Sequence, residues 1–320
     1  DVGQGDSILI QTPNGKAMLV DAGDSDAGSR IVSILRSRGV SSLDAAVASH
    51  AHADHIGGYQ TVLSTFPVGA FYDAGYPATS ATFERLLTTI DQKNIRYVTP
   101  TRGQTVDIDP SVHIDVLSPD GSSRGEIHDN MLVLRLSYGT FSALLAGDMP
   151  DSLEDEIASS LSPTTVLKVG HHGSRTSSSA TFLNVIRPQV AIISVGAGNS
   201  YGHPTAETLQ RLRNVGATVY RTDQSGTVTI STDGNTYTVV TERTGGSAGT
   251  APSASVATTQ KQTTRSTVAA VAPVSSSAVA ITAVDLKGET VTITNSGSSP
   301  VNLAGWILTD EGAKHSYTFS

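Results

Sequence analysis

The chain has 320 residues, contains no cysteine and carries a formal net charge of −8 at pH 7. A disulfide framework is therefore excluded, and the acidic balance argues against a protein that holds nucleic acid by a broad basic surface. A nuclease is not excluded, because bound divalent cations reverse the local charge at a site. The length predicts two domains, of which the larger can bury a substantial core.

The ends of the sequence indicate a fragment of a longer polypeptide. No stretch is long and apolar enough to span a bilayer, and no signal peptide is visible. The chain begins inside a strand-like motif, without Met, and ends at Phe319-Ser320 in what reads as the middle of a domain. We therefore expect both ends to be cut.

The first predicted elements form a hairpin. Residues 6–11 and 17–20 read as strands, and the turn between them contains an Asn-Gly pair, a strong signal for a tight hairpin. Asp6 opens the first strand and reads either as a turn residue or as an acid that faces the substrate. Asp21 ends the second strand, where a plain turn residue is one interpretation.

Four side chains that can bind metal ions follow the next predicted strand, residues 43–49. His50 and His52 have the two-residue spacing that places side chains on one face of an extended chain. Asp54 and His55 follow after the turn and can reach a second point nearby. Imidazole and carboxylate suit zinc, manganese or iron, and the absence of cysteine removes the usual structural zinc sites. Because the whole chain has only nine histidines, we interpret this cluster as a metal site rather than as a polar loop.

The remaining elements mix helices and strands without a strict alternating repeat. This pattern favours a layered α/β architecture over a doubly wound sheet. Helices are predicted over residues 29–39 and 83–90, from residue 150, over 181–186 and around Leu209 and Leu212. Strands are predicted over residues 97–98, 105–108, 113–117, 138–146, 165–169, 190–195, 218–220, 227–230 and 237–240.

Several predicted strands end in further candidate site residues. Asp148 follows one strand beside a glycine, a position that suits a carboxylate ligand. His171 and His172 follow the next strand, and His203 follows the one after it. Spacing alone leaves open which of these histidines complete a metal site.

These motifs together carry a family resemblance. His-x-His-x-Asp-His followed by Gly-Gly resembles the signature of the metallo-β-lactamase superfamily, whose fold is an αββα sandwich. Five further stretches make the resemblance specific to one branch of that superfamily: DVGQGDS at residues 1–7, LVDAG at 19–23, LLAGD at 144–148, KVGHHGS at 168–174 and YGHP at 201–204. Over residues 1–242, the sequence resembles the extracellular hydrolase domain of ComEC-type competence proteins and their free-standing secreted relatives.

The resemblance implies a centre with two divalent ions, zinc or manganese. His50 and His52 would hold the first ion, with either His128 or water as a further ligand. In the wider superfamily a third histidine lies just before a strand of the kind that follows His128. ComEC-type sequences tend to carry asparagines there, so the choice between His128 and Asn130 stays open.

The second ion would be held by Asp54 and His55, together with His172 or His203, while Asp148 would bridge the two ions. Asp54, Asp148 and His203 would form the catalytic surround. The nucleophile would be a hydroxide between the ions, because metal coordination lowers the pKa of water toward neutrality.

Outside the ligands, the resemblance implies that Asp21 orients the loop that carries His50 to His55, since such outer partners fix ligand geometry. Ser174 and Asn199 could donate hydrogen bonds to phosphate oxygens. Both residue types are also common in loops, so an ordinary loop role is the alternative.

After residue 242 the composition changes. Residues 243–279 are dominated by small and hydroxylated residues and are predicted to be a linker, because they offer few large apolar groups. Alternating strands restart at residues 280–284 and 290–295, and residues 280–320 resemble the start of a lamin-tail immunoglobulin-like β-sandwich. Trp306 would be its core anchor. The resemblance implies a partial domain that binds a surface or a partner.

Phosphodiesters, and DNA in particular, are the substrates that these resemblances favour. ComEC-type domains are associated with degrading one strand during DNA uptake, and lamin-tail modules often accompany secreted nucleases. Both point to an extracellular or cell-surface location in a bacterium. Since a fold does not choose its substrate, two alternatives remain: a small-molecule hydrolase such as a lactonase or β-lactamase, and a non-catalytic surface binding protein.

Overall fold

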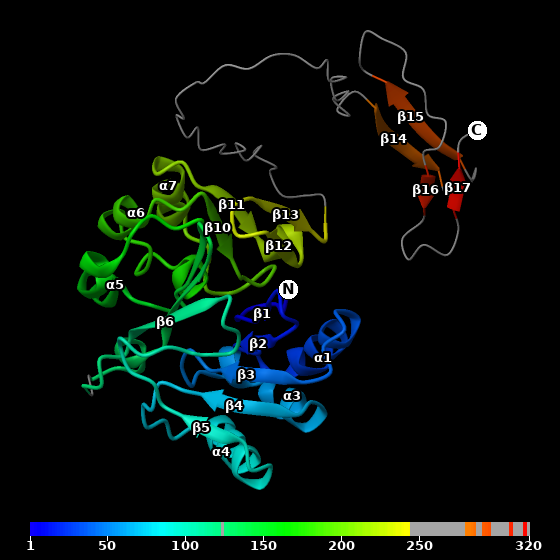
Figure 1. Cartoon of the computed structure of the whole chain (residues 1–320). Helices are drawn as coiled ribbons and strands as arrows, with labels where there is room; N and C mark the ends of the chain where they lie inside the picture. The colour runs from blue at the N-terminus through cyan, green and yellow to red at the C-terminus, as the bar shows by residue number, and fades with distance from the viewer. Residues whose placement is uncertain (123–124, 244–278, 286–289, 296–306, 310–315, 319–320) are drawn as a thin grey trace, which may run out of the picture. The chain divides into compact units, whose positions relative to one another are not determined.

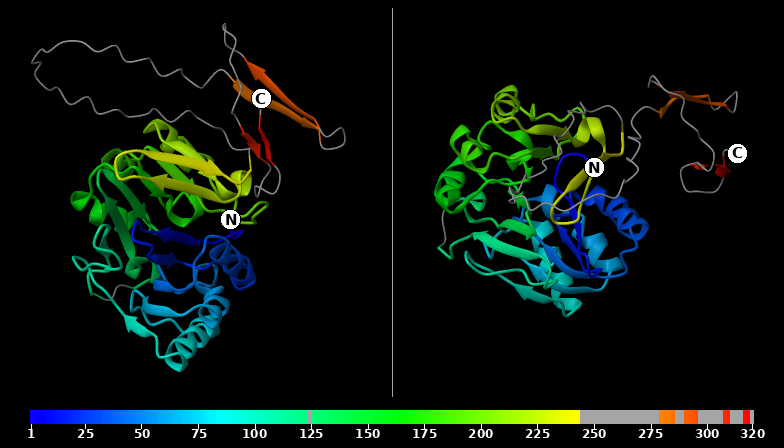
Figure 2. Two further views of the ribbon diagram at one scale, coloured as in Figure 1. Left: turned by 45° about the vertical axis from the view of Figure 1, so that its right-hand side comes forward. Right: turned by 45° about the horizontal axis from the view of Figure 1, so that its top comes forward.

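The structure, a computed structural model, describes residues 1–122, 125–243, 279–285, 290–295, 307–309 and 316–318. The chain divides into two compact units, Asp1–Ser255 and Val256–Ser320. In the first unit, two β-sheets pack face to face and helices cover their outer faces (Figures 1 and 2). This arrangement confirms the predicted αββα sandwich.

The first sheet has the strand order β1-β2-β3-β4-β5. Only β1 and β2 pair antiparallel, as a hairpin, and the later neighbours are parallel. Its strands are β1 (Ile8–Gln11), β2 (Ala17–Val20), β3 (Leu43–Val47), β4 (Val68–Tyr72) and β5 (Arg96–Val98). The helices that pack on it are α1 (Gly28–Ser37), α3 (Tyr59–Thr65) and α4 (Ala81–Gln92).

The second sheet has the order β11-β10-β9-β8-β7-β6. Its strands are β6 (His113–Ser118), β7 (Val133–Tyr138), β8 (Phe141–Leu145), β9 (Val166–Lys168), β10 (Val190–Ile193) and β11 (Thr218–Arg221). Its helices are α5 (Asp151–Ile157), α6 (Ala180–Ile186) and α7 (Ala206–Asn214). A separate hairpin follows, β12 (Val228–Thr232) and β13 (Tyr237–Thr241).

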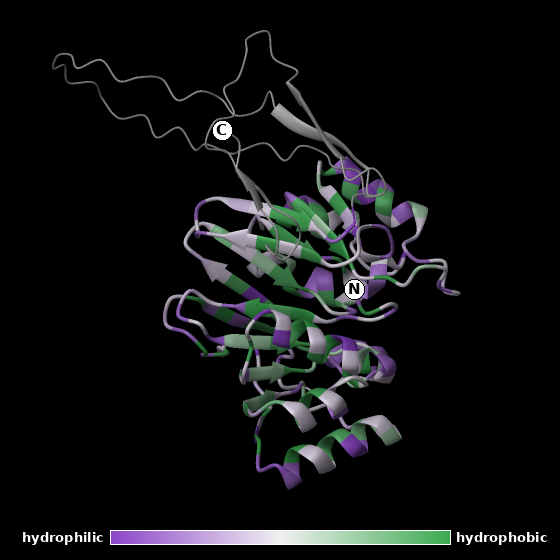
Figure 3. Cartoon of the chain, turned by 90° about the vertical axis from the view of Figure 1, so that its right-hand side faces the viewer, coloured by the Kyte–Doolittle hydropathy of each residue, from purple (hydrophilic) through white to green (hydrophobic). Residues whose placement is uncertain are grey.

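Three apolar clusters hold these layers together, one between the sheets and one under each helical layer. The side chains of β2 show how a strand serves two of them: Met18 and Val20 face the second sheet, whereas Leu19 packs under the helices. A strand buried on both faces needs a continuous apolar run, and β2 has one. Figure 3 shows that the strands are largely hydrophobic, whereas hydrophobic and hydrophilic residues alternate along the helices. This alternation is expected for helices with one buried face.

Short helical turns occupy several of the connections between these elements. They are η1 (Ser25–Ala27), α2 (Ala53–Ile56), η2 (Ile127–Asn130), η3 (Ala158–Ser160), η4 (Gly170–Gly173) and α8 (Thr222–Ser225). Three of these turns, α2, η2 and η4, carry histidines of the candidate site.

Two of the strand predictions are wrong: one predicted strand is divided into two, and the other is not formed. The strand predicted over residues 138–146 is divided, because Tyr138 ends β7 and Gly139 turns the chain into β8 at φ 58°. A side chain at Gly139 would also collide with the backbone of Gly234. Residues 105–108 form no strand; Thr105 makes only an isolated bridge to Asp115. In addition, β4 was not predicted.

In the second unit, β14 (Val279–Asp285) pairs antiparallel with β15 (Thr290–Asn295), which confirms the two strands predicted there. A second pair consists of β16 (Ile307–Thr309) and β17 (Ser316–Thr318). Trp306 and nearly all of the predicted linker lie outside the described residues, so the domain boundaries and the lamin-tail resemblance stay predictions. None of the described helices is long and apolar enough to cross a membrane.

Candidate metal centre

Loops that leave strands of both sheets converge on one cluster of histidines and aspartates. From the first sheet, β3 leads into His50, and the following loop and α2 carry His52, Asp54 and His55. From the second sheet, β8 leads to Asp148. The loop after β9 carries His171 and His172, and the turn η2 carries His128.

Asp21 fixes the start of the loop that carries the ligands. Its carboxylate accepts hydrogen bonds from the backbone N–H and the hydroxyl of Ser49, both at 2.7 Å. The same carboxylate lies 2.8 Å from Nδ1 of His55. All three residues are buried. The structure therefore places Asp21 where the sequence predicted it, behind the ligand loop.

The two glycines after His55 are needed for close packing of this loop. A Cβ at Gly58 would lie 2.1 Å from the carbonyl oxygen of Ala22, and one at Gly57 would lie 2.4 Å from the backbone nitrogen of Ser25. Any side chain at these positions would push α2 away from the segment after β2. The Gly-Gly pair is thus a requirement of the loop geometry.

One group of potential ligands consists of His50, His52 and His128, whose ligand atoms lie within 4.8 Å of one another. His50 Nε2 and His52 Nδ1 are 3.0 Å apart. Burial lowers the pKa of His50 well below its usual value and that of His128 to about 4. Neutral imidazoles with converging nitrogens are the form that binds metal ions. The structure therefore brings His128 to the position that the resemblance left open.

A second group consists of Asp54, His55 and His172. The Asp54 carboxylate lies 3.3 Å from Nε2 of His172 and 3.8 Å from Nε2 of His55. Nδ1 of His172 lies 2.9 Å from the carbonyl oxygen of Ser194, which leaves Nε2 to face the cluster. Of the two histidines predicted for this position, the structure places His172 in the group.

Asp148 lies between the two groups. Its carboxylate oxygens are 3.3 Å from Nε2 of His55, 3.5 Å from Nε2 of His172 and 4.0 Å from Nε2 of His50. His171 adds a further contact at 3.7 Å. This central position is the one that a bridging carboxylate requires.

The electrostatics of the cluster fit bound cations. Burial lowers the pKa of His172, but the carboxylates of Asp148, Asp54 and Asp6 outweigh that effect and raise it to about 9. Burial likewise opposes protonation of His55, and Asp148 with Asp21 raises its pKa well above the usual value. The carboxylates thus attract positive charge, which a metal ion would supply in place of the protons.

Unpartnered buried atoms point in the same direction. Among the described residues, Nε2 of His55, His128 and His172 and Oδ1 of Asp148 are buried without a hydrogen-bond partner. Buried polar atoms without partners are costly and call for a ligand or an ion. Imidazole nitrogens and carboxylate oxygens are also the donor set of zinc and manganese. The residues present therefore fit divalent ions.

The loop after β9 has an unusual backbone that spacing could not predict. His171 and His172 both adopt left-handed conformations, with φ 48° and φ 52°. Non-glycine residues rarely adopt this conformation, and such strain concentrates at functional sites. The turn directs two adjacent histidines to the cluster, so that both can contact Asp148.

Asp6 lies behind His172 and not at the surface. It is buried, its carboxylate is 2.7 Å from Nζ of Lys168, and it is 3.5 Å from Nδ1 of His172. The Lys168 charge and contacts with His172 outweigh burial and lower the pKa of Asp6. Sequence reasoning missed Lys168, because a single lysine in an apolar strand gives no signal for its partner.

The other three predicted residues lie in the surrounding loops. Ser174 is buried, and its hydroxyl is hydrogen-bonded to the Thr176 hydroxyl at 3.0 Å. The side-chain amide of Asn199 bonds to the backbone of its own loop. His203 contacts His171, with ring centroids 5.8 Å apart. Their predicted roles toward substrate remain predictions.

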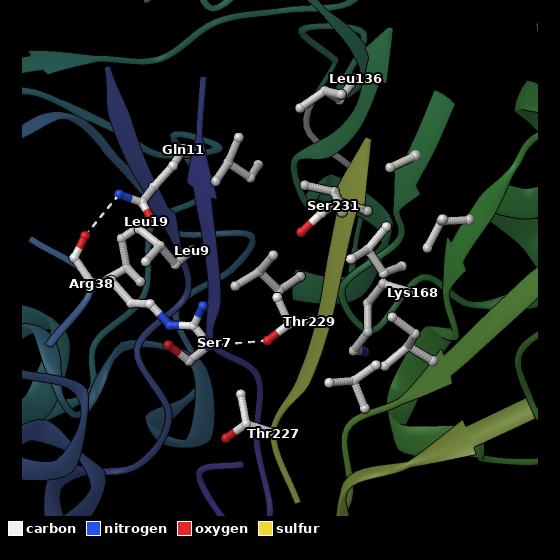
Figure 4. A pocket seen from close by; sticks show the side chains of 18 of the residues that line it. Ser7, Leu9, Gln11, Leu19, Arg38, Leu136, Lys168, Thr227, Thr229 and Ser231 are labelled. Atoms are coloured by element: carbon white, nitrogen blue, oxygen red, sulfur yellow. Dashed lines mark hydrogen bonds between the residues drawn. The ribbon is translucent and has the colours of Figure 1, made fainter. Parts of the chain in front are cut away.

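A separate cavity of 630 Å³ opens between β1 and β12 (Figure 4). Its lining is largely apolar and includes none of the clustered histidines. Arg38 crosses it, donating to the Thr229 hydroxyl and accepting from the Gln11 amide, both at 3.1 Å. Lys168 also lines this cavity, so the ion pair behind His172 separates it from the cluster.

The chain is similar in sequence to known proteins. The family model described as the metallo-beta-lactamase superfamily matches residues 1–197. ComE operon protein 3 of Bacillus subtilis (strain 168) is 30% identical over 247 residues, covering 71% of this chain and 32% of that protein. Competence protein ComA of Neisseria gonorrhoeae is 36% identical over 232 residues, covering 71% of this chain and 30% of that protein.

This chain thus spans about a third of the length of these curated relatives. Among solved structures, the metallo-beta-lactamase fold protein YhfI from Bacillus subtilis aligns at 13% identity with a TM-score of 0.45. The alignment covers 68% of this chain and 89% of that one.

Proposed function

Because this chain belongs to the metallo-β-lactamase superfamily, we propose that it is a metal-dependent hydrolase of phosphodiesters and that its substrate is DNA. The observation that carries the proposal is the position of Asp148 between two groups of ligands. Two adjacent cation sites with a shared carboxylate suit displacement at phosphorus, where the attacking and leaving oxygens both carry negative charge.

His50, His52 and His128 would hold one ion, and Asp54, His55 and His172 would hold the other, with Asp148 shared between them. Divalent ions there would lower the pKa of a coordinated water and polarise the phosphoryl oxygens.

Residues that are hydrogen-bonded to the ligand histidines keep the ligand nitrogens in place. The Asp21 carboxylate accepts a hydrogen bond from Nδ1–H of His55, and the Ser194 carbonyl accepts one from Nδ1–H of His172. In both rings Nε2 is left facing the cluster. The Asp6–Lys168 ion pair closes off the cluster behind His172, where bulk water would compete for the ligands.

DNA is favoured as the substrate by the kinds of relative found. One relative is named a competence protein and another a ComE operon protein. The motifs resemble ComEC-type domains, which are associated with degradation of one DNA strand during uptake. A bacterial extracellular or cell-surface location is part of the same proposal, as is a surface-binding role for the second unit.

The test uses the full chain loaded with manganese or zinc. Its substrates are end-labelled single- and double-stranded DNA, bis-p-nitrophenyl phosphate, nitrocefin and a lactone. We expect metal-dependent cleavage of DNA that is lost in Asp148→Ala and retained in Asp107→Ala, a matched change at an exposed aspartate.

Turnover of nitrocefin or the lactone with intact DNA would instead assign the protein to small-molecule hydrolysis. Absence of turnover of every substrate by the metal-loaded protein would favour a binding protein. A variant that ends at residue 243 tests whether the second unit binds a surface. If it does, this variant should no longer attach to cells, and its rate of hydrolysis should be unchanged.

A further inference from the structure

Tyr201 is an exposed aromatic residue in the loop between β10 and α7. Its exposed fraction is 69%, compared with 39% for Tyr97, the other tyrosine counted among the exposed large hydrophobic residues of the described chain. Apolar surface of this size contributes nothing to the core. The ring is thus accessible to a ligand, and it lies in the same loop as His203, whose ring contacts that of His171.

The loop that carries Tyr201 is tied by the side chain of Asn199. The Asn199 amide donates to the carbonyl oxygens of Gly196 and His203, at 3.1 and 2.7 Å. Its oxygen accepts from the backbone N–H groups of Tyr201 and His203, both at 3.1 Å. Four hydrogen bonds from one side chain fix this turn, so Tyr201 is presented by a preorganised loop.

One face of the Tyr201 ring is already used. It stacks on the imidazole of His203, with centroids 5.9 Å apart and an interplanar angle of 26°. The His203 ring in turn lies 5.8 Å from that of His171, whose Nε2 is 3.7 Å from the Asp148 carboxylate. A short chain of ring contacts therefore connects Tyr201 to the centre of the cluster.

We propose that Tyr201 is a stacking platform for one nucleobase of single-stranded DNA, next to the phosphodiester at the metal cluster. This inference rests on the proposed function. A tyrosine ring that stacks on His203 on one side can accept a flat π-system on the other. Every nucleobase has such a face, so binding would tolerate all four bases. In duplex DNA that face is covered by neighbouring base pairs, which makes the platform selective for single strands.

The experiment measures steady-state cleavage by the full, metal-loaded chain. The substrates are a single-stranded oligonucleotide and the same oligonucleotide with abasic positions around the scissile bond. Stacking on an aromatic side chain is worth enough that we expect Tyr201→Ala to raise KM for the normal strand about tenfold. Tyr201→Leu should behave like Tyr201→Ala, because it keeps apolar area but removes the π-system.

Two comparisons separate stacking from a structural effect. Tyr201→Phe should restore KM to within about twofold of the wild-type value, since phenylalanine keeps the ring. On the abasic strand, wild-type KM should already be raised, and Tyr201→Ala should add no further increase. Val240→Ala, a change at another exposed apolar residue, on β13, serves as the control.

An equal KM for wild type and Tyr201→Ala on the normal strand would overturn the platform. So would an equal increase on the normal and abasic strands. If the wild-type chain cleaves no phosphodiester, the proposed function fails by itself, and the platform is then tested by anisotropy with a fluorescein-labelled single strand. Loss of that binding in Tyr201→Ala with rescue by Tyr201→Phe would support the platform, and unchanged binding would refute it.

Discussion

Asp21 Oδ2 lies 2.8 Å from Nδ1 of His55, on the side of the ring opposite the Nε2 atom that faces Asp148 at 3.3 Å. One buried carboxylate thus determines which nitrogen of His55 is offered to a cation. Because the same carboxylate binds Ser49, the first residue of the ligand loop and one of its ligands are fixed by a single side chain.

Replacement of Asp21 by Asn should therefore weaken metal binding without removing a ligand. An amide can donate to Nδ1 and so favour the wrong tautomer of His55, and losses of about 10- to 100-fold in metal affinity are typical for such outer partners. Calorimetric titration of the apoprotein with Mn²⁺ or Zn²⁺ measures the change, with Asp107→Asn as the surface control. Equal affinities for the wild type and Asp21→Asn would show that the contact is only structural.

His128 and His203 can be told apart by counting metal ions. His128 shares a ligand group with His50 and His52, whereas His203 stacks on Tyr201 and contacts His171. We expect His128→Ala to retain about one ion fewer per chain than the wild type, and His203→Ala to retain the wild-type number. Elemental analysis after gel filtration measures both. The reverse result would exchange the two assignments.

Asp109, which lies outside the proposed ligand groups, should make a pH-dependent contribution to stability. Hydrogen bonds from Ser111, Thr12 and Asn14 hold the pKa of its carboxyl well below the usual value. A carboxyl whose pKa is depressed by folding stabilises the protein above its unfolded pKa of about 3.9, and loses that effect as the pH falls toward the folded value.

The wild type should therefore be more stable than Asp109→Asn at pH 7, and the difference should shrink as the pH falls below about 4. Urea denaturation at pH 7, 5 and 3 measures the difference between the two proteins. A difference that is the same at pH 3 and pH 7 would contradict the contribution of the ionised carboxylate.

The hydroxyl of Tyr59 supports the strand that leads into the ligand loop, and its contribution can be measured. Its buried hydroxyl lies 2.7 Å from the carbonyl oxygen of Val47 at the end of β3 and 3.0 Å from that of Leu19 on β2. Tyr59→Phe keeps the ring and should reduce the free energy of unfolding by about 1–2 kcal/mol. Urea denaturation checks this value, and an unchanged midpoint and slope would mean that the hydroxyl contributes nothing.

The sequence predicted the parts of the site that are local in the chain. The cluster from His50 to His55 can be recognised from the sequence, because four potential ligands within six positions need no knowledge of the fold. The hairpin of β1 and β2 and the helices α1 and α4 are equally local, since an Asn-Gly turn and a regular apolar spacing identify them. The family resemblance supplied the fold and added Asp148 and His172.

The rest depends on contacts between distant residues. Lys168 and Asp6 pair across 162 positions of the chain, and nothing near either one indicates the other. The hydrogen bonds of the Asn199 amide to its own loop are likewise set by backbone geometry, which the sequence does not show. Strand β4 was missed because it is short, contains Gly69 and lacks an alternating pattern.

Anomalous diffraction from crystals of the manganese-loaded protein would locate the bound ions directly. We predict two anomalous peaks: one among His50, His52 and His128, the other among Asp54, His55 and His172. The Asp148 carboxylate should lie between them. A single peak, or peaks away from Asp148, would contradict the two-ion centre on which the proposed hydrolysis of DNA rests.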